Sequence, residues 1–191
     1  RTALFCLPQN GFYLADTLLT YILKPGYYQL PCDLKSLCSV RHFQKNDLPE
    51  VMELARNSFL ENRFFVDPHL DPRRAKNFYA QWIKNYCEDQ ARIAWVARRK
   101  GRIVGFLAYE LNKEVRRITG KQLWGHGLGA VSPSAKGVYP AFLSFAIKHH
   151  GGRGDIIEFD ALLTSIEANR VYQSLNLRLA KTQYTWHQWL G

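Results

Sequence analysis

The sequence predicts an α+β domain with a central, mostly antiparallel sheet flanked by helices. From residue 39 onward, strand-like and helix-like patterns follow in the order strand, helix, helix, three strands, helix, strand, helix and two strands. The polar turn at residues 99–102, which contains a glycine, joins two of these strands in the manner of a β-hairpin. One later helix stands between two strands and indicates a single strand–helix–strand crossover.

Composition limits the class of protein. The chain has 191 residues, which is the length of one domain or of one domain with a small appendage. Hydrophobic residues make up 47% and charged residues 22%, which excludes disordered, coiled-coil and collagen-like chains. No apolar run approaches the roughly 20 residues of a membrane-spanning helix. The four cysteines lack the spacing of a metal finger, so we expect free thiols in a reducing, cytoplasmic setting and no bound metal.

Residues 1–38 are expected to form a small N-terminal subdomain in front of a domain over residues 39–191. Residues 11–24 read as one or two strands, and Pro25, Gly26 and Pro31 interrupt the pattern after them. The chain begins at Arg1 with neither a methionine nor a signal-peptide core, which is consistent with missing residues before it.

Two helices are expected in the first half of the larger domain, after a short strand at residues 40–43. Asn46 or Asp47 caps the first helix, which runs to residue 59. Asp71 caps the second, which runs to about residue 87. Residues 63–73, between the helices, read as a polar loop.

The second half begins with the hairpin strands at residues 91–98 and 103–111, followed by a strand at residues 122–131. This third strand holds glycines at positions 125, 127 and 129. Glycines inside a strand often mark a bulge or a place where a ligand approaches the backbone closely.

The remaining pattern predicts a helix, a buried strand, a second helix and a closing hairpin. The first helix spans residues 138–150, and the strand spans residues 156–163. Ser165 caps the second helix, over residues 166–175. Residues 177–180 and 183–189 are expected to pair as a last hairpin.

The junction at residues 131–139 (VSPSAKGVY) joins a strand to a helix and carries the strongest local signal for a site. A helix N-terminus offers unpaired N–H groups and a partial positive charge, so it binds phosphate readily. Gly137 lets the backbone approach an anion, and Lys136 adds charge. The alternative interpretation is an ordinary strand-to-helix turn.

This junction, residues 169–177 (NRVYQSLNL) and the order of elements together resemble the GNAT superfamily of acyl-CoA-dependent N-acyltransferases, over about residues 39–191. The chain departs from the usual motif in that its loop is two residues short and Tyr139 stands where the family has its last glycine. Asn176 and Leu177 replace a Gly-Phe pair.

Three further segments are similar to the TDP-fucosamine acetyltransferase group. They are residues 11–17 (GFYLADT), 61–68 (ENRFFVDP) and 77–85 (NFYAQWIKN). Members of that group acetylate the 4-amino group of a nucleotide-linked amino sugar and carry a small N-terminal subdomain. The resemblance therefore implies an acetyl-CoA-dependent N-acetyltransferase that acts on such a sugar by direct transfer.

The resemblance also implies roles for individual residues. Tyr172 would protonate the departing thiolate, and Asn169 would contact the pantetheine arm or its sulfur end. The remaining acetyl-CoA contacts would come from the glycine-rich strand, beside the pantetheine, and from the helix start, at the diphosphate: Gly129, Ala130, Val131, Lys136, Gly137, Val138 and Tyr139. A Tyr hydroxyl with a pKa near 10 is reasonably matched to a thiol with a pKa near 8.5.

The general base stays open among Glu110, His126 and Glu158. His126 lies between two glycines, and an ordinary histidine pKa near 6.5 suits proton abstraction. Its alternative is a sheet-face histidine bonded to backbone. Arg63 is the candidate contact for a phosphate of the nucleotide-sugar, with a solvated loop arginine as the alternative.

Charge leaves several partners to weigh. Lys and Arg total 26 against 16 Asp and Glu, for a formal net charge of +10. Such a surplus favours phosphorylated partners, and the basic residues form no long run. The resemblance implies phosphorylated small molecules as partners in preference to nucleic acid. The alternatives are an acetyltransferase for another amine (a peptide or a small polyamine) and a catalytically silent module that binds CoA or nucleic acid. No membrane partner is expected, and a homodimer is left open.

Overall fold

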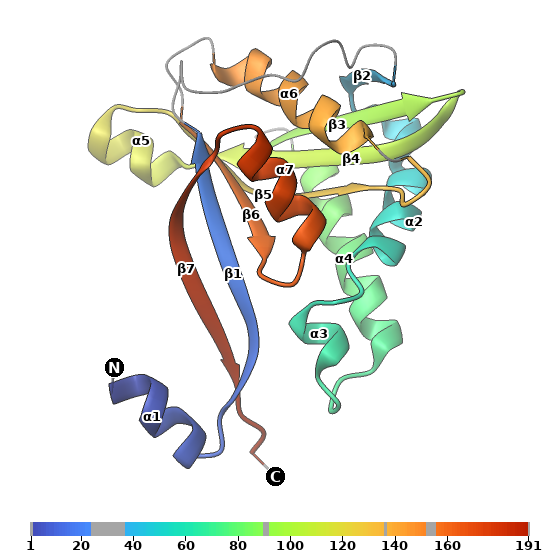
Figure 1. The fold of residues 1–191 in the computed structure, drawn as a ribbon. Coiled ribbons are helices and arrows are strands. Elements are labelled where there is room, and N and C mark those ends of the chain that lie inside the picture. Colours follow the sequence, from blue (N-terminus) through green and yellow to red (C-terminus); the bar gives the residue numbers. More distant parts are fainter. Residues whose placement is uncertain (1, 24–36, 90–91, 136, 152–155, 191) are drawn as a thin grey trace.

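A mixed sheet runs through the molecule (Figure 1). The computed structural model describes residues 2–23, 37–89, 92–135, 137–151 and 156–190, and within them the sheet has seven strands in the order β2-β3-β4-β5-β6-β1-β7. The strands are β1 (Tyr13–Leu23), β2 (Ser39–His42), β3 (Arg92–Arg99), β4 (Arg102–Leu111), β5 (Leu123–Val131), β6 (Ile156–Leu162) and β7 (Arg178–His187). Every neighbouring pair is antiparallel except β5 with β6. The predicted α+β class with a mostly antiparallel sheet is therefore confirmed.

Helices cover both faces of this sheet. They are α1 (Thr2–Gln9), α2 (Leu48–Ser58), α3 (Arg63–Val66), α4 (Pro72–Glu88), α5 (Lys113–Thr119), α6 (Val138–Gly151) and α7 (Ile166–Ser174). Alternate residues of β4 separate the two cores: Phe106 packs with α2 and α4, and Leu107 packs with α6 and α7. None of the described helices is both long and apolar enough to cross a membrane.

The predicted β3–β4 hairpin is confirmed. Its turn places Lys100 at φ 50° and Gly101 at φ 80°. Two successive residues with positive φ form the tight turn whose twist matches that of the strands, which explains the glycine at this point.

The N-terminal segment does not stand apart from the larger domain. Its strand β1 lies inside the common sheet, hydrogen-bonded to β6 on one side and to β7 on the other (Figure 1). Residues 24–36, between this strand and β2, lie outside the described residues, so the boundary at residue 38 stays a prediction. The sheet nevertheless takes in the strand that we expected in a separate subdomain.

The predicted closing hairpin is wrong. Residues 178–187 form the single strand β7, because no Gly, Pro, Asn or Asp interrupts them to make a turn. The antiparallel partner of β7 is β1, from the opposite end of the chain. Two segments far apart in sequence thus build this edge of the sheet.

Side-chain caps mark the start of three helices, whereas the predicted caps Asp47 and Ser165 stand at the N-cap positions of α2 and α7 without a side-chain cap hydrogen bond. Asp71 accepts a hydrogen bond from the Arg73 backbone N–H at 2.9 Å and caps α4 as expected. Asn62 caps the short α3 in the same way, within the segment predicted as a loop. The helices α1 and α5 were not predicted. Asn112 starts α5, and Gly120 ends it at φ 70°.

Candidate active site

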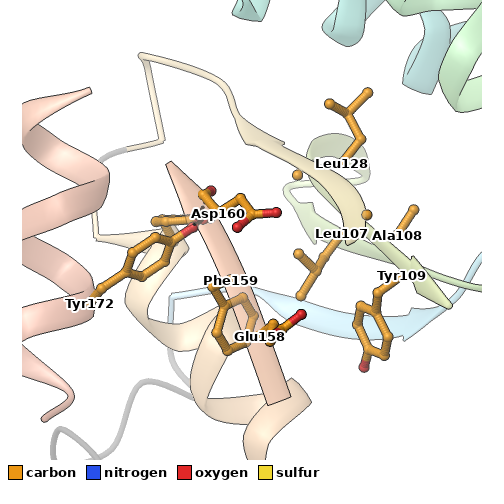
Figure 2. Close-up of a pocket in the computed structure, with 11 residues that line it drawn as sticks. Leu107, Ala108, Tyr109, Leu128, Glu158, Phe159, Asp160 and Tyr172 are labelled. Atoms are coloured by element: carbon orange, nitrogen blue, oxygen red, sulfur yellow. Dashed lines mark hydrogen bonds between the residues drawn. The ribbon is translucent and has the colours of Figure 1, made fainter. Parts of the chain in front are cut away.

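A pocket opens where β5 and β6 separate. The two parallel strands pair only at Leu123 with Ile156 and at Trp124 with Ile157, and then diverge. The space between them, including the part open to solvent, measures about 380 Å³. Its walls are residues 107–109 of β4, 127–129 of β5 and 158–160 of β6, with Tyr139 and Tyr172 (Figure 2). The pocket therefore lies along the open edge of the glycine-rich strand.

A bulge in β5 shapes one wall of this pocket. Ala108 of β4 lies opposite Leu128, but Glu110 lies opposite Gly125, so β5 holds one extra residue at positions 126–127. A Cβ atom on Gly127 would lie 1.4 Å from the Ala108 carbonyl oxygen. Only glycine fits there. The bulge that the glycine pattern indicated is confirmed.

Beyond Trp124, β5 has no strand on its β6 side within the described residues. Gly129, Ala130 and Val131 pair with β4 on their other side. Their remaining backbone edge faces the gap, and Gly129 lines the pocket. An extended ligand that carries amide groups can add to such an edge as a further strand does. The predicted pantetheine contacts of these residues fit this geometry and stay a prediction.

Two tyrosines form the buried wall of the pocket. The hydroxyl oxygens of Tyr139 and Tyr172 lie 2.7 Å apart, and the Tyr172 hydroxyl donates to the backbone carbonyl of Asp160 at 3.2 Å. In that arrangement Tyr139 is the donor to Tyr172. Burial raises the pKa of Tyr172 well above its ordinary value and the pKa of Tyr139 to about 12. Both phenols therefore keep their protons at neutral pH and can act as donors.

Two carboxylates extend into the pocket from β6. Glu158 and Asp160 alternate with the buried Phe159, so both occupy the opposite face of the strand from it (Figure 2). The Thr20 hydroxyl of β1 donates to Asp160 Oδ1 at 2.6 Å. Sequence reasoning named Glu158 as a candidate base but missed Asp160, although the same alternation around Phe159 places both.

The other candidate bases lie differently. Glu110 forms an ion pair with Arg92, whose Nε lies 2.7 Å from Glu110 Oε2, and Arg92 in turn stacks over the Tyr86 ring. Glu110 is not among the residues that line the pocket. His126 belongs to the β5 bulge by its backbone, but its side chain lies outside what the structure describes. Of the three candidates, the structure brings Glu158 to the pocket.

Asn169 lies at the start of α7, not in the pocket wall. Its side-chain amide donates to the carbonyls of Leu162 and Ser165 at 2.9 and 3.0 Å, which ties the helix to the end of β6. The Asn169 residue is 8% exposed, and its Oδ1 has no hydrogen-bond partner among the described residues. The contacts support a structural role, and the implied contact with pantetheine stays a prediction.

The junction before α6 keeps part of its expected form. Lys136 lies outside the described residues. Gly137 adopts φ 82°, a conformation that favours glycine. The Val138 N–H already donates to the Ala135 carbonyl at 3.2 Å, so this donor is not free for an anion. Tyr139, expected at the diphosphate, places its side chain in the pocket.

Arg63 lies at the first position of α3. Its Nη1 lies 3.3 Å from Asp16 Oδ2 of β1, and its guanidinium stacks over the Phe64 ring. The predicted phosphate contact of Arg63 stays a prediction.

The sequence was compared with protein families and with curated proteins. No family model matches the sequence. The spore coat polysaccharide biosynthesis protein SpsD of Bacillus subtilis (strain 168) is 26% identical over 186 residues. The match takes in 96% of this chain but only 61% of SpsD, so the chain spans less than two thirds of that relative.

Several solved structures share the architecture at low sequence identity. A conserved protein of unknown function from Staphylococcus epidermidis superposes with a TM-score of 0.64 at 15% identity, over 96% of this chain and 65% of its own. A GNAT-family acetyltransferase from Colwellia psychrerythraea gives a TM-score of 0.60 at 14% identity, over 95% and 60%. A putative GNAT acetyltransferase from Novosphingobium aromaticivorans gives 0.56 at 15% identity, over 94% and 69%. The chain therefore has the fold of the GNAT acetyltransferases.

Proposed function

We propose that this protein is an acetyl-CoA-dependent N-acetyltransferase that transfers the acetyl group directly to an amine. The observation that carries the proposal is the gap between β5 and β6, shaped by a bulge that only Gly127 fits and closed on one side by the Tyr139–Tyr172 pair. A catalytically silent CoA-binding module would need the open strand edge but not a buried pair of proton donors.

The residues of the gap fit acetyl-CoA. The free edge of Gly129, Ala130 and Val131 can pair with the amides of the pantetheine arm, and the turn at Gly137 lies at the start of α6, where a diphosphate would be held. Acetyl-CoA supplies a thioester, an activated acyl group that a neutral amine can accept. A bound thioester and acceptor would displace water from the pocket, which favours transfer to the amine over hydrolysis.

Side chains of the pocket then donate a proton to the leaving sulfur and accept one from the acceptor amine. Tyr172 donates a proton to the sulfur that departs, and Tyr139 stabilises the resulting phenolate through their shared hydrogen bond. The carboxylates of Glu158 and Asp160 attract the ammonium form of the acceptor, and Glu158 takes one proton from it. The neutral amine then forms a C–N bond with the acyl carbon as the C–S bond breaks. The proton that the acylated nitrogen then releases restores the Tyr172 hydroxyl. No cysteine is needed as a nucleophile, because the amine attacks directly.

For the acceptor we propose the amino group of a nucleotide-linked amino sugar. The three segments that resemble the nucleotide-sugar acetyltransferases contribute to β1, α3 and α4. SpsD, the relative in polysaccharide biosynthesis, supports a sugar acceptor. A peptide or polyamine acceptor is the second candidate, since the carboxylates of β6 attract any ammonium group.

Thiol release from acetyl-CoA, measured across a panel of amines, tests the proposal. We expect release with a nucleoside-diphosphate amino sugar and little with polyamines or peptide α-amines. Release with polyamines alone would refute the sugar acceptor. CoA binding without thiol release from any amine would indicate a silent module, and absence of both would refute the proposed function.

A further inference from the structure

Two polar side chains, Thr20 and Asp16, lie on one face of β1, at increasing distance from the pocket. Asp16, Leu18 and Thr20 share a face of the strand, because no register shift lies between them. Thr20 lies opposite Asp160, so this face continues the pocket wall made by β6. Asp16 lies four residues further along, or about 13 Å at about 3.3 Å per residue.

Asp16 pairs with Arg63 at that point, and both influence Tyr79 electrostatically. The side chain of Asp16 is 7% exposed, and that of Arg63 is 35% exposed. Arg63 Nη1 lies 3.3 Å from Asp16 Oδ2, which is a long contact for a charge-assisted hydrogen bond. Burial raises the pKa of Tyr79 to about 12. The charge of Arg63 acts in the opposite direction and that of Asp16 in the same direction, so both charged groups influence the phenol. Three polar groups from β1, α3 and α4 therefore converge.

The hydrogen bonding of Asp16 is incomplete in comparison with two other buried aspartates. Asp47 accepts two bonds from Arg41 and one from the Gln44 backbone, at 2.6–2.8 Å. Asp67 accepts bonds from Tyr13, His187, Trp189 and the His69 backbone. Asp16 has the one long contact with Arg63, and its buried Oδ1 has no hydrogen-bond partner among the described residues. Because a buried carboxylate oxygen without a hydrogen-bond donor is costly, we expect a bound ligand to supply that donor.

We propose that Asp16 and Arg63 form the distal half of the acceptor site, and that they bind a phosphorylated amino sugar whose amine lies against β6. This inference rests on the proposed function and names the recognition elements of its substrate. Arg63, the exposed member of the pair, turns its guanidinium to the phosphate. Asp16 Oδ1 then accepts a hydrogen bond from a sugar hydroxyl that the bound phosphate holds in place, so the free sugar does not make this contact.

The chemistry selects the substrate by length as well as by charge. The amine binds near Glu158 and Asp160, and the phosphate binds near Arg63, on the same face of the sheet. A sugar ring that carries its phosphate far from its amine spans the two ends, whereas a bare amino sugar reaches only one. Arg63, the more exposed member of the distal pair, also disfavours a polyamine, because its guanidinium repels a second ammonium group.

The test compares a nucleotide-linked amino sugar, the same sugar 1-phosphate and the free amino sugar, in wild type and in variants. Asp16→Asn is expected to raise KM for both phosphorylated sugars at least tenfold, with kcat within about twofold and CoA affinity unchanged. Arg63→Ala is expected to do the same, and Arg63→Lys to recover part of the loss. A preference for the nucleotide over the 1-phosphate would show that the nucleotide adds contacts of its own.

Asp47→Asn is the matched control, because it weakens a buried Arg–Asp pair beside β2, at the other end of the sheet. It is expected to lower stability and leave KM unchanged. Equal losses with phosphorylated and free sugars in Asp16→Asn would overturn the inference, since they would indicate a structural role.

Calorimetric titration with the sugar nucleotide separates failure of the site from failure of the activity. Binding by wild type that Asp16→Asn abolishes supports the site even if no thiol is released, and in that case only the proposed transfer is refuted. Acetylation of free amines, with no binding of the phosphorylated sugars, would overturn the site and leave the transfer standing.

Discussion

Replacing Gly127 by alanine is the sharpest test of how the β5 bulge is held. The new Cβ would lie 1.4 Å from the Ala108 carbonyl oxygen and 2.7 Å from Tyr109 Cα, whereas real contacts of this kind are not closer than 3.0 Å. Because both atoms belong to the backbone of β4, the strands must separate by about 1.6 Å from their ordinary spacing of about 4.8 Å. That separation breaks a local hydrogen-bonded pair and leaves one N–H and one C=O buried. At about 1–3 kcal/mol for each group, we expect a loss of about 2–6 kcal/mol in the free energy of unfolding.

Equilibrium unfolding in urea, followed by tryptophan fluorescence, measures this loss. Gly129→Ala is the matched control on the same strand, because the one close contact of its Cβ would be with the Cδ1 end of the Leu107 side chain, at 2.8 Å, and the nearest backbone atom lies at 3.6 Å. A flexible side chain can move, so we expect that variant to lose about 1 kcal/mol or less. Equal stabilities for the two alanine variants would refute the backbone origin of the bulge.

Three further predictions concern the tyrosine pair and a buried aspartate. Tyr172→Phe should lower kcat by about 10²-fold, as expected for loss of a general acid, with CoA affinity nearly unchanged; unaltered turnover would remove Tyr172 from the mechanism. The raised pKa of Tyr139 means that the unfolded chain ionises before the folded one, so stability present below pH 10 should fall between pH 10 and about 12. In Tyr139→Phe, the free energy of unfolding measured with urea should fall less steeply over this pH range. An unchanged dependence on pH would contradict the raised pKa of Tyr139. Burial of Asp67 opposes its ionisation, but its hydrogen bonds from His187 and Tyr13 outweigh this and lower its pKa, so its stabilising effect should be lost as pH falls below about 4. Unfolding curves at pH 3 and pH 6 should therefore differ less in Asp67→Asn than in wild type, and an equal difference would count against this account.

Most elements of the fold could be predicted from the sequence, because their signals act between neighbouring residues. The β3–β4 turn, the Asp71 cap and the glycines of β5 each act on neighbouring residues, so their patterns are readable without a structure. Tyr172 was likewise identified from its position in a sequence motif, and the structure places it in the pocket wall. Alternation around Phe159 was also readable, and it placed Glu158 on the face that the structure shows lining the pocket.

Only the tertiary structure decided which distant residues meet. No local pattern shows that β1 enters the sheet between β6 and β7, since either strand could have taken a nearer partner. The same long-range pairing brings Asp16 to Arg63 and Thr20 to Asp160, and it sets the side chain of Tyr139 against that of Tyr172. Glu110, by contrast, forms an ion pair with Arg92 on the neighbouring strand and does not line the pocket. The residues of the site were thus visible in the sequence as types, but their pairing is a property of strand order and register, which hydrogen bonding between distant segments fixes.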